Sequence, residues 1–376
     1  MSKFRIILQA LRKEIAEGKY AAQRRLPTES QLVARFEVSR PTVTRALDEM
    51  EAEGIVERRA GSGTYLKRGA PLDAGRLGMI VPALGNTEIF DPICAEIVRE
   101  ASEEQYTVLS NGSWPDNPAD RARLAEDLCR QYIQKQVSGV FFAPVELIPE
   151  DEALNLRVVA ALDEAGIPLV LLDRDTHRFP HRSQFDLVGI DNFTAGFDLA
   201  RHLIGLGCHR IVFVARPFSA PTVDLRIAGW LEAMVRARLE SGSKRVCLGD
   251  AGNDAFVQDV LRQTRPEAII CANDMTAATV MQSLARLGVR VPEDIRLVGF
   301  DDLKYARLLS VPLTTMQQPC RAIGEVAVEA MRERIRNPKM AAREILLKAT
   351  LVVRDSCGSK LPKSGAGARP VAAAKS

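Results

Sequence analysis

The chain has 376 residues, 46% of them apolar, which is enough for two or three domains with cores of their own. We find neither a secretory signal pattern at the N-terminus nor a run of about 18 apolar residues, so we expect a cytoplasmic protein without a membrane partner. Seven cysteines stand singly, with no Cys-x-x-Cys pair, which favours reduced thiols over disulfides or a zinc site.

Charge is distributed unevenly along the chain, although the formal net charge is only +3. Residues 1–68 hold 14 Lys and Arg against 9 Asp and Glu, whereas residues 69–357 hold 33 against 39. Residues 358–376 add four basic residues and no acidic one. A small basic segment joined to a larger acidic one predicts a polyanionic partner for the basic segment.

The basic segment begins with three predicted helices. Apolar residues recur at helical spacing over residues 4–17. A second helix is expected after Thr28, because Thr28 and Gln31 form a capping-box pattern. A third is expected with Ser39 as its N-cap and Pro41 in its first turn, where the missing N–H costs nothing.

Two short strands around a glycine-rich turn are predicted for the stretch "IVERRAGSGTYL" that follows. Three helices and a hairpin in this order predict a winged helix-turn-helix. The third helix carries Arg40, Thr42, Thr44 and Arg45 on or beside the face that points away from its apolar stripe. A helix N-terminus favours phosphate, and Arg and Thr contact bases or phosphates, so this helix is expected to bind DNA.

Residues 4–66 resemble the DNA-binding head of the GntR family, most clearly in "RRLPTESQLVARFEVSRPTVTRALDEMEAEGIVERRAGSGTYL". The resemblance implies that Arg40 and Thr42 face bases or phosphates, that Thr44 and Arg45 flank them, and that the wing approaches the minor groove. The expected DNA-contacting residues are Ser30, Arg40, Thr42, Thr44, Arg45, Arg59, Gly61, Ser62 and Gly63.

Residues 69–75 are rich in Gly and Pro and are expected to form a linker after a head of residues 1–68. Nine apolar runs alternate with helical stretches over residues 76–357, which predicts an α/β body of two doubly wound parallel-sheet lobes. We expect lobe one at about 76–186 and 319–346, lobe two at about 187–318 and 347–357, and a disordered tail at 358–376.

Polar residues follow several predicted strands, where the ligands of open α/β sheets bind. Asp173, Arg174, Arg226 and Asp301 supply two carboxylates and two guanidinium groups, and an anionic ligand would favour a less balanced set. A polyol fits such a set, because each hydroxyl group both donates and accepts hydrogen bonds. Helix capping is an equal alternative for three further acidic residues, Asp191, Asp274 and Asp302.

Residues 76–357 resemble the LacI-type effector domain and the periplasmic sugar-binding proteins, in stretches such as "IPLVLLDRD", "DLRIAGW" and "IRLVGFDD". The resemblance implies a periplasmic-binding-protein-like fold and a sugar site closest to the ribose-binding pattern, with arabinose, xylose and other monosaccharides left open. The sugar contacts that it implies are Phe90, Asp173, Arg174, Arg226, Asn273, Asp301 and Gln318. A GntR-like head on a LacI-like body is similar to the arabinose-repressor type of chimera.

Other functions find little support in the sequence. His177 and His181 have a metal-like spacing but enclose Pro180, and no nucleophile elbow or phosphate-binding loop is present, so we expect no metal, cofactor or catalysis. A transport protein would not need the head. We therefore expect a homodimeric repressor that binds operator DNA under the control of a sugar. A purine, nucleoside or sugar-phosphate effector, acting as co-repressor or activator, remains the alternative.

Overall fold

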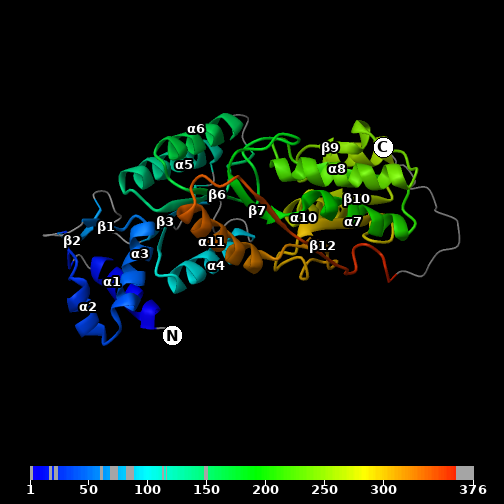
Figure 1. The fold of residues 1–376 in the computed structure, drawn as a ribbon. Helices are drawn as coiled ribbons and strands as arrows, with labels where there is room; N and C mark the ends of the chain where they lie inside the picture. Colours follow the sequence, from blue (N-terminus) through cyan, green and yellow to red (C-terminus); the bar gives the residue numbers. More distant parts are fainter. Residues whose placement is uncertain are drawn as a thin grey trace.

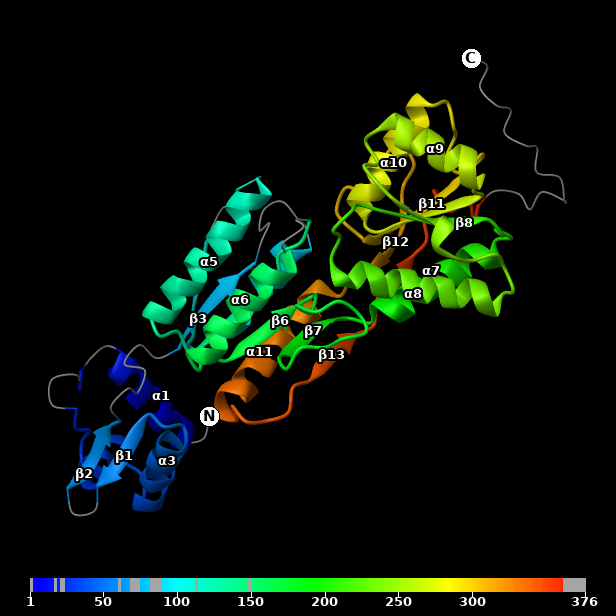
Figure 2. The ribbon, with the colours of Figure 1, turned by 90° about the horizontal axis from the view of Figure 1, so that it is seen from above.

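The computed structural model describes residues 3–16, 19–20, 24–59, 62–67, 75–81, 89–111, 114–115, 117–147 and 151–360. These residues form a small head followed by two α/β lobes (Figure 1). The head lies beside the first lobe and the second lobe lies at the far end of the molecule (Figure 2). Within the described residues no helix is long and apolar enough to cross a membrane, and the seven cysteines are free, as expected.

The head has the predicted order of three helices and a hairpin. Its elements are α1 (Lys3–Ala16), α2 (Glu29–Phe36), α3 (Arg40–Ala52), β1 (Val56–Arg59) and β2 (Gly63–Leu66). The capping box at Thr28 and Gln31 is confirmed, and Ser39 is the N-cap residue of α3, although its hydroxyl makes no capping bond. Leu11, Leu32 and Leu47 are fully buried, so the apolar faces of the three helices share one core.

The first lobe is built on a six-stranded parallel sheet in the order β13-β7-β6-β5-β3-β4. Its strands are β3 (Arg76–Ile80), β4 (Thr107–Ser110), β5 (Gly139–Phe142), β6 (Leu169–Leu172), β7 (Asp186–Ile190) and β13 (Glu344–Leu347). Helices α5 and α6 cover one face and α4 and α11 the other (Figure 1). These helices are α4 (Phe90–Glu103), α5 (Pro118–Gln134), α6 (Asp151–Glu164) and α11 (Cys320–Arg336).

The second lobe repeats this plan in the order β14-β12-β11-β10-β8-β9, with β14 antiparallel to β12. Its strands are β8 (Ile211–Ala215), β9 (Val246–Leu248), β10 (Ala268–Cys271), β11 (Arg296–Asp301), β12 (Thr314–Gln317) and β14 (Thr350–Val352). Its helices are α7 (Asn192–Gly205), α8 (Pro221–Arg236), α9 (Asp254–Thr264), α10 (Asp274–Arg286) and the 3-10 turn η1 (Ser243–Arg245). In each lobe the strand order reverses once, which is where doubly wound sheets bind ligands.

Two expected boundaries are wrong. Strand β7 belongs to the first sheet, so the chain crosses to lobe two after Ile190 and not at residue 187. The expected tail at 358 also begins too early, because Lys360 ends a described turn in which its Nζ lies 2.6 Å from Asp355. Residues 361–376 lie outside the described residues, as do the linker residues 69–74.

Helices α7 and α8 pack with their backbones almost in contact. This packing fixes the position of Arg226, a residue of the site described in the next subsection. A Cβ atom at Gly229 would lie 2.0 Å from the carbonyl oxygen of Phe193, and one at Gly196 would lie 2.2 Å from that of Arg226. Glycine is therefore needed at both positions. The close approach sets Arg226 of α8 beside Asn192, the first residue of α7.

Candidate functional site: a DNA-binding head and a site between the lobes

The N-terminal end of α3 presents the polar surface predicted for it. The side chain of Arg40 is 78% exposed, and its Nε lies 2.9 Å from Glu29. The hydroxyl groups of Thr42 and Ser39 are 2.8 Å apart. The guanidinium group of Arg45 lies 5.0 Å from the centre of the ring of Phe4, near the first residue of α1. These exposed groups remain available to a partner outside the chain.

The wing is held by a residue that we did not predict. Arg25 donates a hydrogen bond of 2.9 Å to the carbonyl oxygen of Ser62, and its guanidinium group lies 5.8 Å from the centre of the Tyr65 ring. Arg59 lies over the same ring, at 4.8 Å. The neighbouring "RR" in front of "LPTES" was a charge signal that could have pointed to Arg25. Gly63 has a φ of +120°, which suits glycine, whereas the predicted Gly61 lies outside the described residues.

The remaining predicted head residues lie near this surface. Ser30 is exposed at the start of α2, where its hydroxyl is 3.1 Å from that of Thr28. Thr44 is half-buried, and its carbonyl oxygen faces Arg58, which also pairs with Glu29 at 3.1 Å. Arg58 thereby joins the wing to α2 and α3. The helix α3 and the wing are thus held to one another by side chains of the head itself.

In the body, lobe one supplies a buried charged group at the ends of β5 and β6. Arg174 donates from Nε to Asp173 Oδ2 at 3.0 Å, and its Nη1 lies 2.7 Å from Glu146 Oε1. The guanidinium carbon lies 5.4 Å from the centre of the Phe90 ring, at the start of α4. Phe90 is itself almost fully buried. Arg174 is therefore stacked on one residue and held between two carboxylates.

Lobe two supplies a matching group. Arg226 donates from Nε to Asn192 Oδ1 at 2.8 Å and from Nη1 to the carbonyl oxygen of Ala272 at 2.6 Å. Its Nη2 lies 3.8 Å from Asp301 Oδ1, which accepts a 2.8 Å hydrogen bond from Gln318. Four predicted ligand residues thus form one pattern of alternating charge, with Asp173, Arg174 and Asp301 at strand ends and Arg226 on α8.

Charges of the two lobes influence each other directly. Burial raises the pKa of Asp301, the nearby carboxylates of Asp173 and Glu146 add to the rise, and Arg226 opposes it. Burial alone would also raise the pKa of Glu146, but Arg174 and the N–H of Ala220 more than offset burial and hold that pKa below its usual value. The residues of lobes one and two therefore form a single electrostatic site.

One atom of this site lacks a hydrogen-bond partner among the described residues. Asp173 Oδ1 is buried, and the residue sits in the left-handed region with a φ of +67°. Asp301, which faces it from lobe two, also has a positive φ of +110°. Buried acceptors are almost always satisfied, and strained backbone gathers at functional sites. Asp173 thus offers an acceptor to a donor that the described chain does not provide.

Several polar residues at strand ends serve the fold. Asn273 caps α10 by accepting from the N–H of Thr276 at 2.8 Å. Asp191 caps α7, which confirms the capping alternative for that residue. Asp274 is buried and accepts from Thr315 at 2.6 Å, and Asp302 pairs with Arg354 at 2.6 Å. Neither of the last two is a helix cap.

Sequence reasoning missed Glu146, and it placed Asn192 among the strand-end residues without selecting it as a ligand contact. Both follow a strand, Glu146 by four residues and Asn192 by two. The strand-end rule that selected Asp173 reaches Asn192, whereas Glu146 lies too far into its loop for that rule to distinguish it. Trp230, by contrast, is fully buried beside Phe213, as expected of a core residue. Trp114 also belongs to a core cluster.

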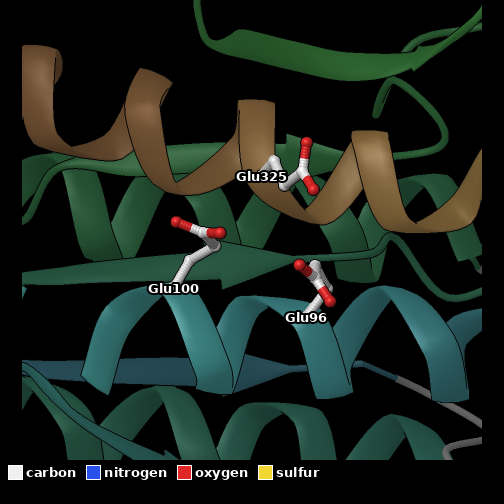
Figure 3. Close-up of side chains that lie close together, drawn as sticks. All are labelled: Glu96, Glu100 and Glu325. Carbon is white, nitrogen blue, oxygen red and sulfur yellow. The ribbon is translucent and has the colours of Figure 1, made fainter. Parts of the chain in front are cut away.

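Three carboxylates lie close together elsewhere in lobe one, from Glu96 and Glu100 of α4 and Glu325 of α11 (Figure 3). Their oxygens come within 4.8 Å of one another. Arg99 already pairs with both glutamates of α4. Because this guanidinium group supplies the counter-charge, we assign no metal to the cluster.

Cavities of very different size border the described residues. A small one of about 80 Å³ has Asp173, Arg174 and Asn192 in its wall, together with Pro221 at the start of α8. A larger one of about 920 Å³ lies between the head and lobe one. Its wall contains Arg12, Glu53, Tyr106 and Arg332, among others, and none of the strand-end residues above. Of the predicted ligand residues, only Asp173 and Arg174 lie in the wall of the small cavity, and Phe90, Arg226, Asn273, Asp301 and Gln318 do not.

Two family profiles match the chain. Residues 5–66 match bacterial regulatory proteins of the gntR family, and residues 200–357 match the periplasmic binding protein-like domain. A regulatory head of this type, joined to a two-lobed ligand-binding fold, defines a DNA-binding transcriptional regulator and not an enzyme.

Known relatives are transcriptional repressors. The arabinose metabolism transcriptional repressor of Geobacillus stearothermophilus is 28% identical over 373 residues, which cover 95% of this chain and 98% of the relative. The HTH-type transcriptional repressor PurR of Klebsiella pneumoniae (strain 342) is 30% identical over 273 residues, which cover 71% and 75%. The chain belongs to this family of bacterial repressors with a LacI-type effector domain, and its head is of the GntR type.

Solved structures agree on the fold. A complex of the transcriptional regulator CelR with cellobiose superposes with a TM-score of 0.65 at 24% identity and covers 85% of this chain and 92% of its own. A regulatory protein of the LacI family from Chloroflexus aggregans superposes with a TM-score of 0.61 at 26% identity and covers 75% and 98%. The GntR-type head and the two parallel-sheet lobes predicted from the sequence are confirmed.

Proposed function

We propose that this repressor binds operator DNA as a homodimer and releases it when a monosaccharide, such as a pentose, binds between the lobes. The proposal that the effector is a sugar rests on Asp173 Oδ1, which is buried and has no hydrogen-bond partner among the described residues. A buried carboxylate oxygen accepts but cannot donate, so its missing partner is a donor such as a sugar hydroxyl group. The relatives named for arabinose metabolism and the ribose operon add support from resemblance.

The ligand contacts that we propose combine the predicted set with the two residues found in the structure. Carboxylates of Asp173 and Asp301 would accept from hydroxyl groups, while Arg174, Arg226, Asn273 and Gln318 would donate to them. Phe90 would pack beneath the ring only if Arg174 moves, because the guanidinium group now covers it. Glu146 and Asn192 hold the two arginines in place.

The DNA contacts that we propose lie on α3 and the wing. Arg40 would exchange its half-buried partner Glu29 for a base or phosphate, and Thr42, Thr44, Arg45 and Ser30 would surround it. The wing residues Arg59, Gly61, Ser62 and Gly63 would reach the neighbouring groove. In a dimer, two such heads would occupy half-sites one helical turn apart.

A screen of thermal stability tests the effector assignment directly. Neutral pentoses and hexoses are compared with purines and nucleosides, because a ligand at 100 times its dissociation constant adds about 2.7 kcal/mol of apparent stability. A shift with a neutral monosaccharide supports the proposal, and the same sugar should then weaken DNA binding in fluorescence anisotropy. A shift with purines or nucleosides alone would contradict it. Light scattering of the sugar-free protein tests the dimer.

A further inference from the structure

Glu146 contacts both lobes: its side chain pairs with Arg174 of lobe one and accepts from the N–H of Ala220 in lobe two. We propose that Glu146 makes this site selective for uncharged ligands, by occupying the guanidinium group of Arg174 and adding a third carboxylate to the site. The inference rests on the proposed function, because it concerns the charge of the effector that binds between the lobes.

The contacts of Arg174 leave little of its charge to a ligand. Its Nη1 lies 2.7 Å from Glu146 Oε1, and its Nε donates to Asp173 Oδ2 at 3.0 Å. Arginine binds carboxylates and phosphates through two parallel N–H groups of its planar fork. Here the protein's own carboxylates have taken two of those positions, Nε and Nη1, so that no pair of parallel N–H groups is left complete for a ligand. An anionic sugar would have to displace one of them.

The second arginine is no more available to an anion. Arg226 donates to Asn192 and to the carbonyl oxygen of Ala272, and its remaining terminal nitrogen faces Asp301 at 3.8 Å. Among the described charged groups of the site, three carboxylates therefore oppose two guanidinium groups. Uptake of a proton by Asp301 would leave two against two, so the site gains no excess positive charge in either state.

The position of Glu146 explains why it resists displacement. It lies in the loop after β5 of lobe one, yet its Oε2 accepts a 2.9 Å hydrogen bond from the N–H of Ala220 in lobe two. Ala220 is the N-cap residue of α8, where the positive end of the helix dipole stabilises an anion. Leu147 also donates to the carbonyl oxygen of Phe218, at 2.8 Å, which fixes the loop against lobe two. Glu146 is therefore held by both lobes before any ligand binds.

The experiment is isothermal titration of the full-length protein with neutral and anionic sugars. The neutral probes are D-ribose, L-arabinose, D-xylose and D-galactose, and the anionic probes are D-ribose 5-phosphate and D-galacturonate. Wild-type protein should bind a neutral sugar and exclude both anions. In Glu146→Gln, which keeps an acceptor for Ala220, the preference for neutral over anionic sugar should fall by about ten-fold or more, because a repelling charge has gone.

Two variants serve as controls. Glu146→Asp retains the charge and should retain the exclusion of anions. Glu126→Gln removes a carboxylate from the surface of the same lobe, where Glu126 pairs with Arg157 at 2.9 Å, and should behave as wild type. Melting temperatures of all three establish that they fold.

The possible outcomes distinguish the role of Glu146 from the proposal that the effector is a sugar. A folded Glu146→Gln variant that excludes the anions as strongly as wild type overturns the role of Glu146 and leaves the proposed function intact. Wild-type protein that binds D-galacturonate or D-ribose 5-phosphate as tightly as any neutral sugar also overturns it, and this measurement needs no variant. Wild-type protein that binds no sugar of either class contradicts the proposed effector, and the inference with it.

Discussion

The head and the body use arginine in opposite ways. In the head, Arg40 is largely exposed and makes one ion pair with Glu29, whereas Arg226 of the body is 5% exposed and fully engaged within the protein. Exposed ion pairs contribute little stability, so Arg40 can exchange Glu29 for DNA at small cost. If a buried guanidinium group leaves its partners, a buried charge remains without a counter-charge, which is costly. Arg40 of the head is thus accessible to a partner, whereas Arg226 of the body is a fixed part of the site between the lobes.

Removal of the buried arginine should have the largest effect. Arg226→Ala leaves Asp301 buried beside two other carboxylates, and loss of one member of a buried pair costs about 3–5 kcal/mol. We expect the free energy of unfolding of the body to fall by that amount in urea denaturation, and effector binding to be lost. The double variant with Asp301→Asn should recover part of the stability. A fall below about 1 kcal/mol would show that the pair is effectively solvated.

The same contrast explains what could be predicted from the sequence. Asp173, Arg174, Asp301 and Gln318 were predictable because the carboxyl ends of parallel strands meet at one edge. Glu146 was not selected, since it lies four residues past β5 and no local pattern distinguishes it from a loop carboxylate.

Three strands, β12, β13 and β14, were also missed. They are only three or four residues long. Asp186 is buried between Arg334 and Arg343, and this group ties β13 to β7 across more than 140 residues of chain. Contacts of such long range leave no trace in local periodicity.

A second prediction concerns how the body positions its buried arginine. Gly229→Ala places a methyl group 2.0 Å from the carbonyl oxygen of Phe193, so α7 and α8 must move apart, at a cost of about 1–3 kcal/mol. Because Arg226 lies one turn earlier on α8, effector affinity should fall together with the melting temperature. Gly205→Ala in α7 is the matched control, since a Cβ there meets no atom within 4 Å. The control should be neutral or stabilising; equal losses in both variants would contradict the packing argument.

The third prediction tests the head. Arg40→Ala should weaken operator binding by about 1–3 kcal/mol if the side chain contacts a base, and by less with a shallower salt dependence if it contacts a phosphate. Its melting temperature should match that of wild type, because Glu29 retains Arg58 as a partner. Anisotropy titrations over a range of salt separate the two cases. Arg123→Ala, an exposed arginine of α5, provides the control, and unchanged DNA affinity in Arg40→Ala would remove that residue from the interface.

The smallest expected effect is the dependence of stability on pH, which should have opposite signs in the head and in the body. In the head, the hydrogen bond from Arg35 lowers the pKa of Glu14 to about 2, against its ordinary value of 4.5. The unfolded chain then binds this proton first as the pH falls, so the head loses stability from about pH 4.5 down to pH 2. In the body, burial raises the pKa of Asp301, so the folded state holds a proton that the unfolded state has released. That contribution is lost as the pH rises above the ordinary range of an aspartate.

These opposite signs predict opposite responses of two variants. As the pH rises from 4 to 7, Asp301→Asn should gain stability relative to wild type, on top of the constant loss from leaving Arg226 without its partner, because it removes a carboxylate whose ionisation burial opposes. Glu14→Gln should lose stability relative to wild type over the same interval, because it removes the ionised partner of Arg35. Urea denaturation at several pH values, followed separately for head and body, measures both differences. The same sign in both variants would mean that Asp301 is held ionised by Arg226, and that the site between the lobes carries its full third negative charge at neutral pH.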